Sequence, residues 1–222
     1  MREKTTDDIL KAFGDFNMSV LEDCIKFTTV CDSYAIPDDP RKLLENGQLQ
    51  DIPIIVGNNA NEGALFYVDM TRKEYINWLI SSFGENIIEV YNMFPAKTDT
   101  EISTSFDKLI TVTSFVAPQR HLCTMASNMG NNNIYFYRFG RVPPTKLAGQ
   151  FGAYHSIEIG YVFGNLNEQD GYTKDDFKLS EQMMDYWVNF AKNDDPNEKN
   201  GTMLPYWPRY DTKTKQTSFL QL

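Results

Sequence analysis

The sequence predicts an α/β fold in which a mostly parallel sheet is flanked by helices, and three observations support this. Two short runs of strand-forming residues, Ile52–Val56 and Ile134–Phe139, lie far apart in the chain. The segments between and after them repeat their apolar residues at helical spacing. Hydrophobic residues make up 41% of the chain and charged residues 23%, as in ordinary packed domains. Strands separated by helices define the α/β class.

Two short helices are expected before the first strand. Thr5 to Asp8 predicts a capped helix start, with acidic residues at the positive end of the helix dipole. Asp39–Gly47 predicts a second helix, because its proline suits a first turn and its glycine a helix end. The β-branched run Ile52–Val56, which Gly57 ends, is typical of a strand that is buried on both faces.

The remaining elements follow the same logic. Helices are expected over Glu74–Phe83, Glu85–Phe94, about Thr100–Met129 and Asp176–Lys192. The second strand, Ile134–Phe139, is bounded by asparagines before it and Gly140 after it. Residues 201–222 predict a loop followed by a last edge strand.

Charge and composition exclude several classes of function. The 21 basic and 30 acidic residues give a net charge of −9, without a basic stripe, so neither nucleic acid nor an anionic membrane surface is an expected partner. No apolar run is long enough for a membrane span. The first residues lack the apolar stretch of a signal peptide. If the natural chain starts upstream of Met1, this absence does not decide between a secreted and a cytoplasmic location. The three cysteines Cys24, Cys31 and Cys123 lack metal-ligand spacing, and their disulfide state stays open.

Two polar residues follow the two predicted strands. Glu62 comes after the first strand and His155, one of two histidines in the chain, comes after the second. Loops that follow parallel strands gather at one edge of the sheet, where ligands bind. An acid followed by a histidine at such an edge matches the chain order of the triad in α/β-hydrolases. The other histidine, His121, lies in a predicted helix and is expected to be structural or at the surface.

Four segments together carry a resemblance to a known family. They are DIPIIVGNNANEGALF at 51–66, GAYHSIEIGYVFG at 152–164, YWVNFAKNDDPN at 186–197 and LPYWPRYD at 204–211. In this order they resemble the type-B carboxylesterases and cholinesterases. The resemblance extends over nearly the whole chain and is fainter before Pro37 and between Tyr67 and Asn131.

The resemblance implies a fold, a reaction and two site residues. Residues 1–222 would be the C-terminal portion of an α/β-hydrolase fold, a carboxylesterase-type serine hydrolase acting on small carboxylic esters. Glu62 would be the triad acid and His155 the general base, 93 residues further on. The mechanism passes through an acyl-enzyme and needs no metal or organic cofactor. Glu158 would be either a second polar anchor beside the site or a purely structural carboxylate.

One part of the family pattern is absent. No Gly-x-Ser-x-Gly string occurs in the chain, and the resemblance places that nucleophile in an N-terminal half, which becomes the expected partner. The chain alone is therefore expected to be inactive. Two alternatives remain open: a non-catalytic cholinesterase-like adhesion or interaction module, and an unrelated acidic α/β binding domain. The particular ester and the oligomeric state are left open as well.

Overall fold

The computed structural model describes residues 3–13, 30–131, 133–197, 204–212 and 220–221. The chain divides into two units, residues 1–40 and 41–222, and each is described by itself. In the first unit, α1 (Thr6–Phe13) begins as predicted. The Thr5 hydroxyl accepts the Asp8 N–H at 3.2 Å, and the Asp8 carboxylate accepts the Thr5 N–H at 3.1 Å. Cys24 lies outside the described residues.

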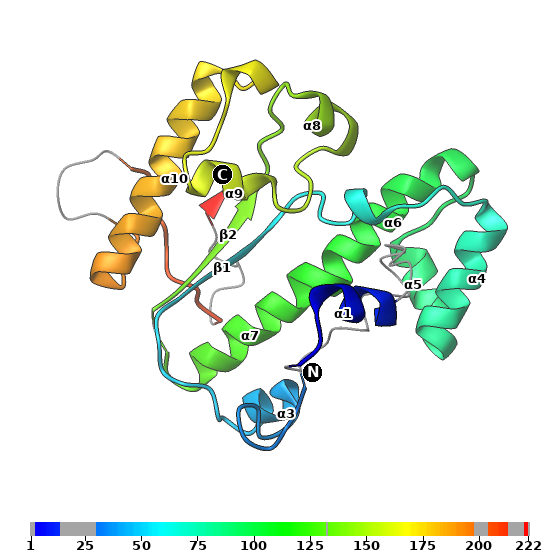
Figure 1. The fold of residues 1–222 in the computed structure, drawn as a ribbon, viewed down its shortest axis with the longest axis horizontal. Helices are drawn as coiled ribbons and strands as arrows, with labels where there is room; N and C mark the ends of the chain where they lie inside the picture. The colour runs from blue at the N-terminus through cyan, green and yellow to red at the C-terminus, as the bar shows by residue number, and fades with distance from the viewer. Residues whose placement is uncertain (1–2, 14–29, 132, 198–203, 213–219, 222) are drawn as a thin grey trace. The chain divides into compact units, whose positions relative to one another are not determined.

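The second unit is built on a three-stranded parallel sheet in the order β1-β2-β3 (Figure 1). The strands are β1 (Ile54–Asn59), β2 (Ile134–Phe139) and β3 (Leu220–Gln221). Ile54 pairs with Ile134 at the start of the β1–β2 ladder and Asn59 pairs with Phe139 at its end. The predicted second strand and the predicted edge strand in the tail are confirmed.

The first strand differs from its prediction in position and in burial. It begins two residues later and continues past Gly57, because Asn58 and Asn59 extend the ladder beside Arg138 and Phe139. The prediction that it is buried on both faces was wrong for this structure, since its apolar residues from Ile54 to Val56 are half-buried. Within the described residues β1 pairs with β2 alone, so its other edge, which we call the open edge, has no strand partner.

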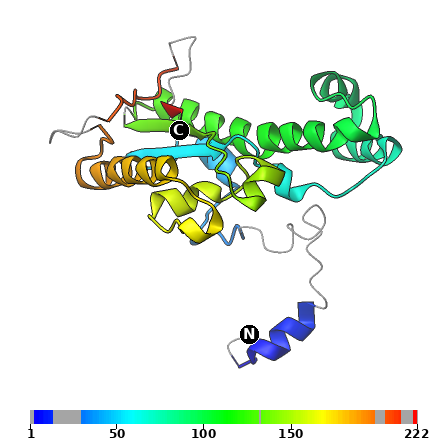
Figure 2. The same ribbon diagram turned by 90° about the horizontal axis from the view of Figure 1, so that it is seen from above.

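Side chains of β2 alternate between two helical layers. Tyr135, Tyr137 and Phe139 join one apolar cluster with residues of α9 and α10 and with the buried Trp207. Ile134 and Phe136 join another cluster with residues of α7. The helices involved are α7 (Ala117–Asn128), α9 (Ile157–Val162) and α10 (Lys174–Asn193), and Figure 2 shows the strands between α7 and α10. This alternation is the period-two pattern of a strand buried on both faces.

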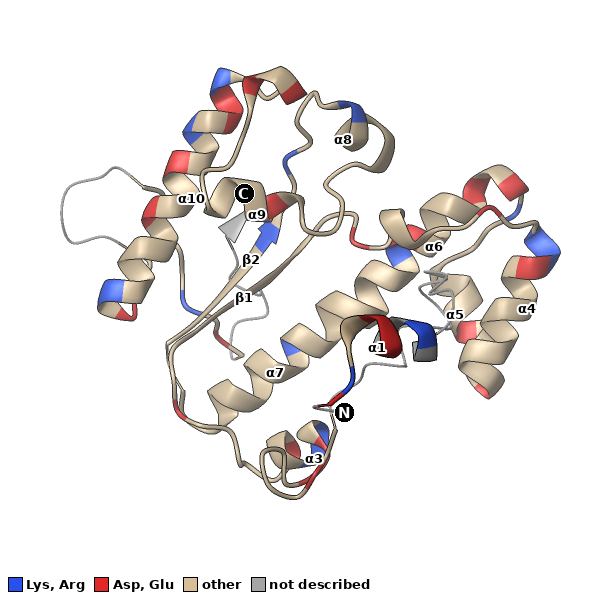
Figure 3. Cartoon of the chain, in the orientation of Figure 1, with Lys and Arg blue, Asp and Glu red and all other residues tan. Residues whose placement is uncertain are grey.

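A further group of helices packs around its own apolar cluster, to which Tyr75, Leu79, Phe106 and Leu109 belong. The remaining helices are α3 (Pro40–Glu45), α4 (Arg72–Phe83), α5 (Ile87–Met93), α6 (Ile102–Ile110) and α8 (Lys146–Phe151). Figure 3 shows the positions of acidic and basic residues along helices α4 and α10. No helix in the described part of the chain has the length and apolar character to cross a membrane.

The helix predicted over about Thr100–Met129 is interrupted by a π-helical turn, Thr111–Val116, between α6 and α7. Pro118 lies just after this turn, in the first turn of α7. A proline has no N–H to donate and its ring clashes with the carbonyl four residues earlier, so the regular bonding is broken there. The Ala117 N–H instead bonds to the carbonyl of Val112, five residues back.

A fully buried carboxylate fastens the start of α10 to the segments before it. Asp176 accepts hydrogen bonds from the Arg141 guanidinium at 2.7 Å and from the Tyr161 hydroxyl at 2.8 Å. It also caps α10 by accepting from the Thr173 hydroxyl at 2.6 Å and the Thr173 N–H at 2.8 Å. Burial by itself would raise the pKa of this carboxyl, but the bonds from Arg141, Thr173 and Tyr161 outweigh it and hold the pKa well below its usual range.

We expect Asp176→Asn to destabilise the protein by about 1–3 kcal/mol at pH 7, because the charged acceptor of these bonds is lost. A carboxyl with a depressed pKa stabilises the fold above its unfolded pKa of about 4, and this contribution is lost as the pH falls through the folded value. The difference between wild type and variant in urea unfolding should therefore shrink from pH 7 to pH 3. The exposed neighbour Asp175 offers the matched control Asp175→Asn, and an equal deficit at both pH values would contradict the prediction.

Candidate active site

The carboxylate of Glu62 is held by the turn that follows β1. Glu62 is 3% exposed, and its Oε1 atom accepts the backbone N–H of Asn59 at 2.6 Å. Its neighbour Gly63 packs against α6 so closely that an added Cβ would lie 2.5 Å from the carbonyl oxygen of Asp107. Because the backbone of α6 leaves no room there, a glycine is needed directly after the acid.

His155 lies in a strained loop between α8 and α9. Gly152, three residues before it, has φ +69°, and a Cβ there would lie 2.4 Å from the Asn61 side-chain oxygen. Ser156, the next residue, also has a positive φ of 72° and forms the N-cap of α9. Non-glycine residues with such backbone angles are uncommon and cluster at functional sites. This loop was not predicted in detail, because α8 and α9 are only six residues each.

The structure brings Glu62 and His155 together across 93 positions of sequence. The second carboxylate oxygen of Glu62 lies 2.6 Å from Nδ1 of His155. The Glu62 side chain is 4% exposed whereas the His155 side chain is 40% exposed. Burial raises the pKa of the Glu62 carboxyl, while the Asn59 N–H and the His155 ring oppose this rise by favouring the charged form. The predicted proximity of these two residues is confirmed.

The imidazole of His155 lies beside two aromatic rings. Phe66 and Phe115 lie with their ring centroids 5.4 Å and 5.1 Å from that of His155. Phe66 comes from the turn after Glu62, and Phe115 comes from the π-helical turn. A proton on Nδ1 that is donated to Glu62 leaves Nε2 of the neutral ring as an acceptor. The arrangement therefore presents a half-exposed base beside an apolar wall, which suits proton transfer to and from an organic molecule.

Glu158 is linked to the acid turn through Asn59, and, in addition to burial, its charge raises the pKa of the Glu62 carboxyl. The Asn59 side-chain NH₂ donates to the Glu158 carboxylate and, at 2.9 Å, to the carbonyl of Tyr154. The fully buried Asn59 therefore links the acid turn to the segment around His155. This contact of Glu158 with Asn59 fits both roles expected for it, a polar anchor beside the site and a structural carboxylate. The side-chain oxygen of Asn59 is buried without a hydrogen-bond partner in the described structure.

Other reactive side chains are placed elsewhere. His121 is exposed on α7. Cys31 is an exposed free thiol and Cys123 is a buried one, and burial raises the pKa of Cys123 to about 12. Among the residues that the structure describes, no group of three or more histidine, cysteine, aspartate or glutamate residues is arranged to hold a metal ion.

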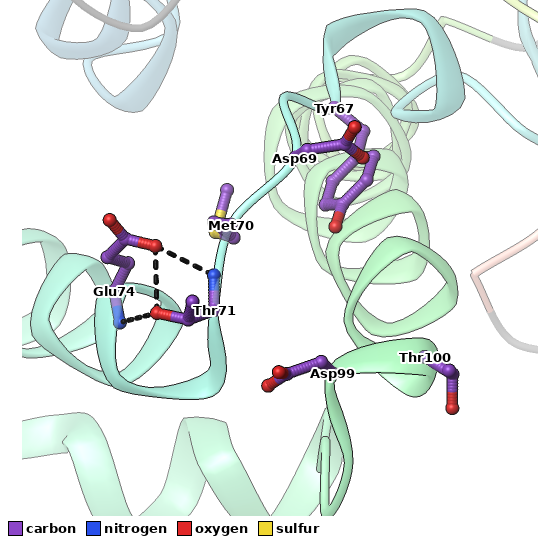
Figure 4. A pocket seen from close by; sticks show the side chains of 7 residues that line it. All are labelled: Tyr67, Asp69, Met70, Thr71, Glu74, Asp99 and Thr100. Atoms are coloured by element: carbon purple, nitrogen blue, oxygen red, sulfur yellow. Dashed lines mark hydrogen bonds between the residues drawn. The ribbon is translucent and has the colours of Figure 1, made fainter.

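A separate hollow of about 410 Å³ lies at the start of α4 and includes neither Glu62 nor His155 (Figure 4). It is lined by Tyr67, Asp69, Met70, Thr71, Glu74, Asp99 and Thr100. Two of its carboxylates cap the start of α4: Glu74 accepts the Thr71 N–H at 2.7 Å, and Asp99 accepts the Arg72 N–H at 2.7 Å. Helix capping therefore accounts for these two acidic groups.

The parallel sheet, its helical layers and the acid–histidine pair at the carboxyl ends of β1 and β2 define an α/β-hydrolase. Comparison with known proteins gives the particular family. The profile of the carboxylesterase family matches residues 1–222, and the chain belongs to that family of hydrolases.

Curated relatives agree with this assignment. The chain is 26% identical to the para-nitrobenzyl esterase of Bacillus subtilis (strain 168), over 97% of this chain and 44% of the relative. It is 29% identical to carboxylesterase 5A of Canis lupus familiaris, over 95% of this chain and 38% of the relative. It is 28% identical to the cocaine esterase of Homo sapiens, over 100% of this chain and 41% of the relative. The chain thus spans less than half the length of these relatives.

Proposed function

We propose that this chain supplies the acid and the general base of a serine carboxylic ester hydrolase. The hydrogen bond of 2.6 Å between the buried Glu62 carboxylate and the half-exposed His155 ring is the observation that carries the proposal. His155 takes a proton from a serine hydroxyl through Nε2 and later gives it to the leaving alcohol. Glu62 fixes the ring tautomer and stabilises the imidazolium as it forms.

The nucleophilic serine comes from an N-terminal half of the same domain. Two observations support this: the sequence contains no Gly-x-Ser-x-Gly string, and the chain covers only 38–44% of the relatives named above. The unpaired edge of β1 and the half-buried apolar side chains on its faces support it as well, since unpaired strand edges are normally covered and the faces of a parallel sheet are normally buried. With the serine and the oxyanion donors outside it, the chain by itself is inactive.

The substrate is a small carboxylic ester. The names of two relatives, para-nitrobenzyl esterase and cocaine esterase, denote esters of small organic molecules. Phe66 and Phe115 beside His155 provide the apolar surface on which such a molecule packs. An acyl-enzyme forms on the serine, and water then releases the acid.

A fluorophosphonate probe tests the assignment of the serine. We expect no labelling of this chain alone above a heat-denatured control, because none of its own serines is activated. In an assembly with the N-terminal half, the label should lie on a serine of that half, as tryptic peptide mass spectrometry would show. Stoichiometric labelling of any serine in the folded chain would overturn the proposal.

A further inference from the structure

Asp107, on α6, is bonded to the residues on both sides of Glu62. One of its carboxylate oxygens accepts the side-chain NH₂ of Asn61 at 2.8 Å. The other accepts the hydroxyl of Thr111 at 3.2 Å, and the same Thr111 oxygen accepts the backbone N–H of Gly63 at 3.1 Å. Asp107 and Thr111 are only 8% and 7% exposed. One buried carboxylate thus reaches both neighbours of the acid, directly on one side and through a hydroxyl on the other.

The same network extends to the histidine loop through Asn61. The Asn61 side-chain oxygen accepts the Ala153 N–H at 3.1 Å, and the Asn61 N–H donates to the Ala153 carbonyl at 3.0 Å. Asn61 and Tyr154 also form a parallel bridge, so the segment just after β1 pairs with the histidine loop beyond α8. Asn61 therefore connects α6 to the residues immediately before His155.

The π-helical turn aligns this network with the imidazole. Thr111 and Phe115 are four residues apart within the turn, and they contact Gly63 and the His155 ring respectively. The close contact of Gly63 with the Asp107 backbone fixes the distance between the acid turn and α6. Polar networks whose members are buried and hydrogen-bonded to one another hold side chains in one geometry.

We propose that Asp107 is a positioning residue, which sets the relative placement of Glu62 and His155 through Asn61 and Thr111. This inference rests on the proposed function of Glu62 and His155 as acid and base. Catalytic groups must be held to within a fraction of an ångström, and a misplacement of 1 Å can cost about 100-fold in rate. The cost should appear in kcat, since Asp107 acts on the triad geometry and not on the bound ester.

The test is made in the assembly of this chain with the N-terminal half. Asp107→Ala should lower kcat for an aryl ester about 10- to 100-fold and leave KM within about twofold. Asp107→Asn should stay within about threefold of wild type, because its amide oxygen accepts from Asn61 and its NH₂ donates to the Thr111 oxygen. The buried Asp176 gives the matched control: Asp176→Asn also removes a buried carboxylate but should leave kcat within about twofold.

A second readout does not depend on ester hydrolysis. The Nδ1 proton that His155 shares with Glu62 should give a low-field ¹H NMR signal, assigned by its loss in His155→Gln. We expect Asp107→Ala to shift or broaden this signal and Asp176→Asn to preserve it. If the wild-type assembly hydrolyses no ester, the proposed function fails, and the NMR signal alone then decides whether Asp107 positions the pair.

Two results would overturn the inference. The first is a wild-type kcat and an unchanged Nδ1 proton signal in Asp107→Ala. The second is a loss of kcat in Asp176→Asn as large as the loss in Asp107→Ala. If Asp107→Ala does not fold, Thr111→Val takes its place, because valine keeps the shape and removes the hydroxyl that holds Gly63. Thr111→Val should lower kcat about 3- to 10-fold, and wild-type kcat and signal in this variant would reject the network.

Discussion

Replacing Glu62 by glutamine in the assembled enzyme should reduce kcat about 10⁴-fold, although the side chain keeps its size. The reason lies in the two partners of the carboxylate. The Asn59 N–H, 2.6 Å from Oε1, requires an acceptor, so the glutamine oxygen must face Asn59 and its NH₂ must face His155. A donor facing Nδ1 forces the ring proton onto Nε2. In that tautomer His155 has no free lone pair with which to take the serine proton.

Replacing His155 by alanine removes the base and should cost at least as much, about 10⁴- to 10⁶-fold. The exposed His121 on α7 gives the matched control, because His121→Ala removes the other histidine and should change kcat less than about twofold. Initial rates with a short-chain aryl ester measure all three variants. Comparable losses at His121 and His155 would reject the assignment of the base.

The juxtaposition of Glu62 and His155 could be predicted from sequence because it depends on two strong local signals. Each residue follows a run of β-branched or aromatic residues, and parallel strands bring their carboxyl ends to one edge. The β2 strand was found at its observed bounds, and β1 was misplaced by a few residues. The asparagines 58 and 59 disfavour a strand by propensity, and only their pairing partners in β2 extend it.

The supporting residues could not be predicted in the same way. Asp107 is 46 positions from its partner Asn61, and no pattern around it distinguishes a buried carboxylate from an ordinary helix-surface one. The position of Phe115 depends on the π-helical turn, which changes the direction of side chains that regular helical spacing would predict. The run of asparagines before Glu62 was the available signal, since asparagine side chains often bond to nearby backbone. This signal does not identify which backbone groups the asparagines bond.

Combining the chain with the N-terminal half should raise ester hydrolysis from solvent background to the rate of an intact enzyme. Loss of the triad serine costs about 10⁶-fold in kcat and loss of one oxyanion donor about 10²- to 10³-fold, so assembly has the largest effect expected for this protein. The two halves should join along the open edge of β1. The Ile54 N–H bonds to the carbonyl of Asn133, on the β2 side, so by the alternation of a parallel ladder the Ile55 N–H points to the open edge.

This orientation gives a matched pair of variants at one position. Ile55→Ala and Ile55→Pro both shorten the side chain, but only proline removes the N–H that would pair with an incoming strand. A lost hydrogen bond that leaves a buried acceptor unpaired costs about 1–3 kcal/mol, which corresponds to about 5- to 150-fold in the dissociation constant. Titrating one half with the other, with esterase rate and sedimentation velocity as readouts, measures that constant. Equal dissociation constants for Ile55→Ala and Ile55→Pro would show that the two halves do not pair through β1. If the wild-type halves show no gain in ester hydrolysis at saturation, the triad is not divided between them.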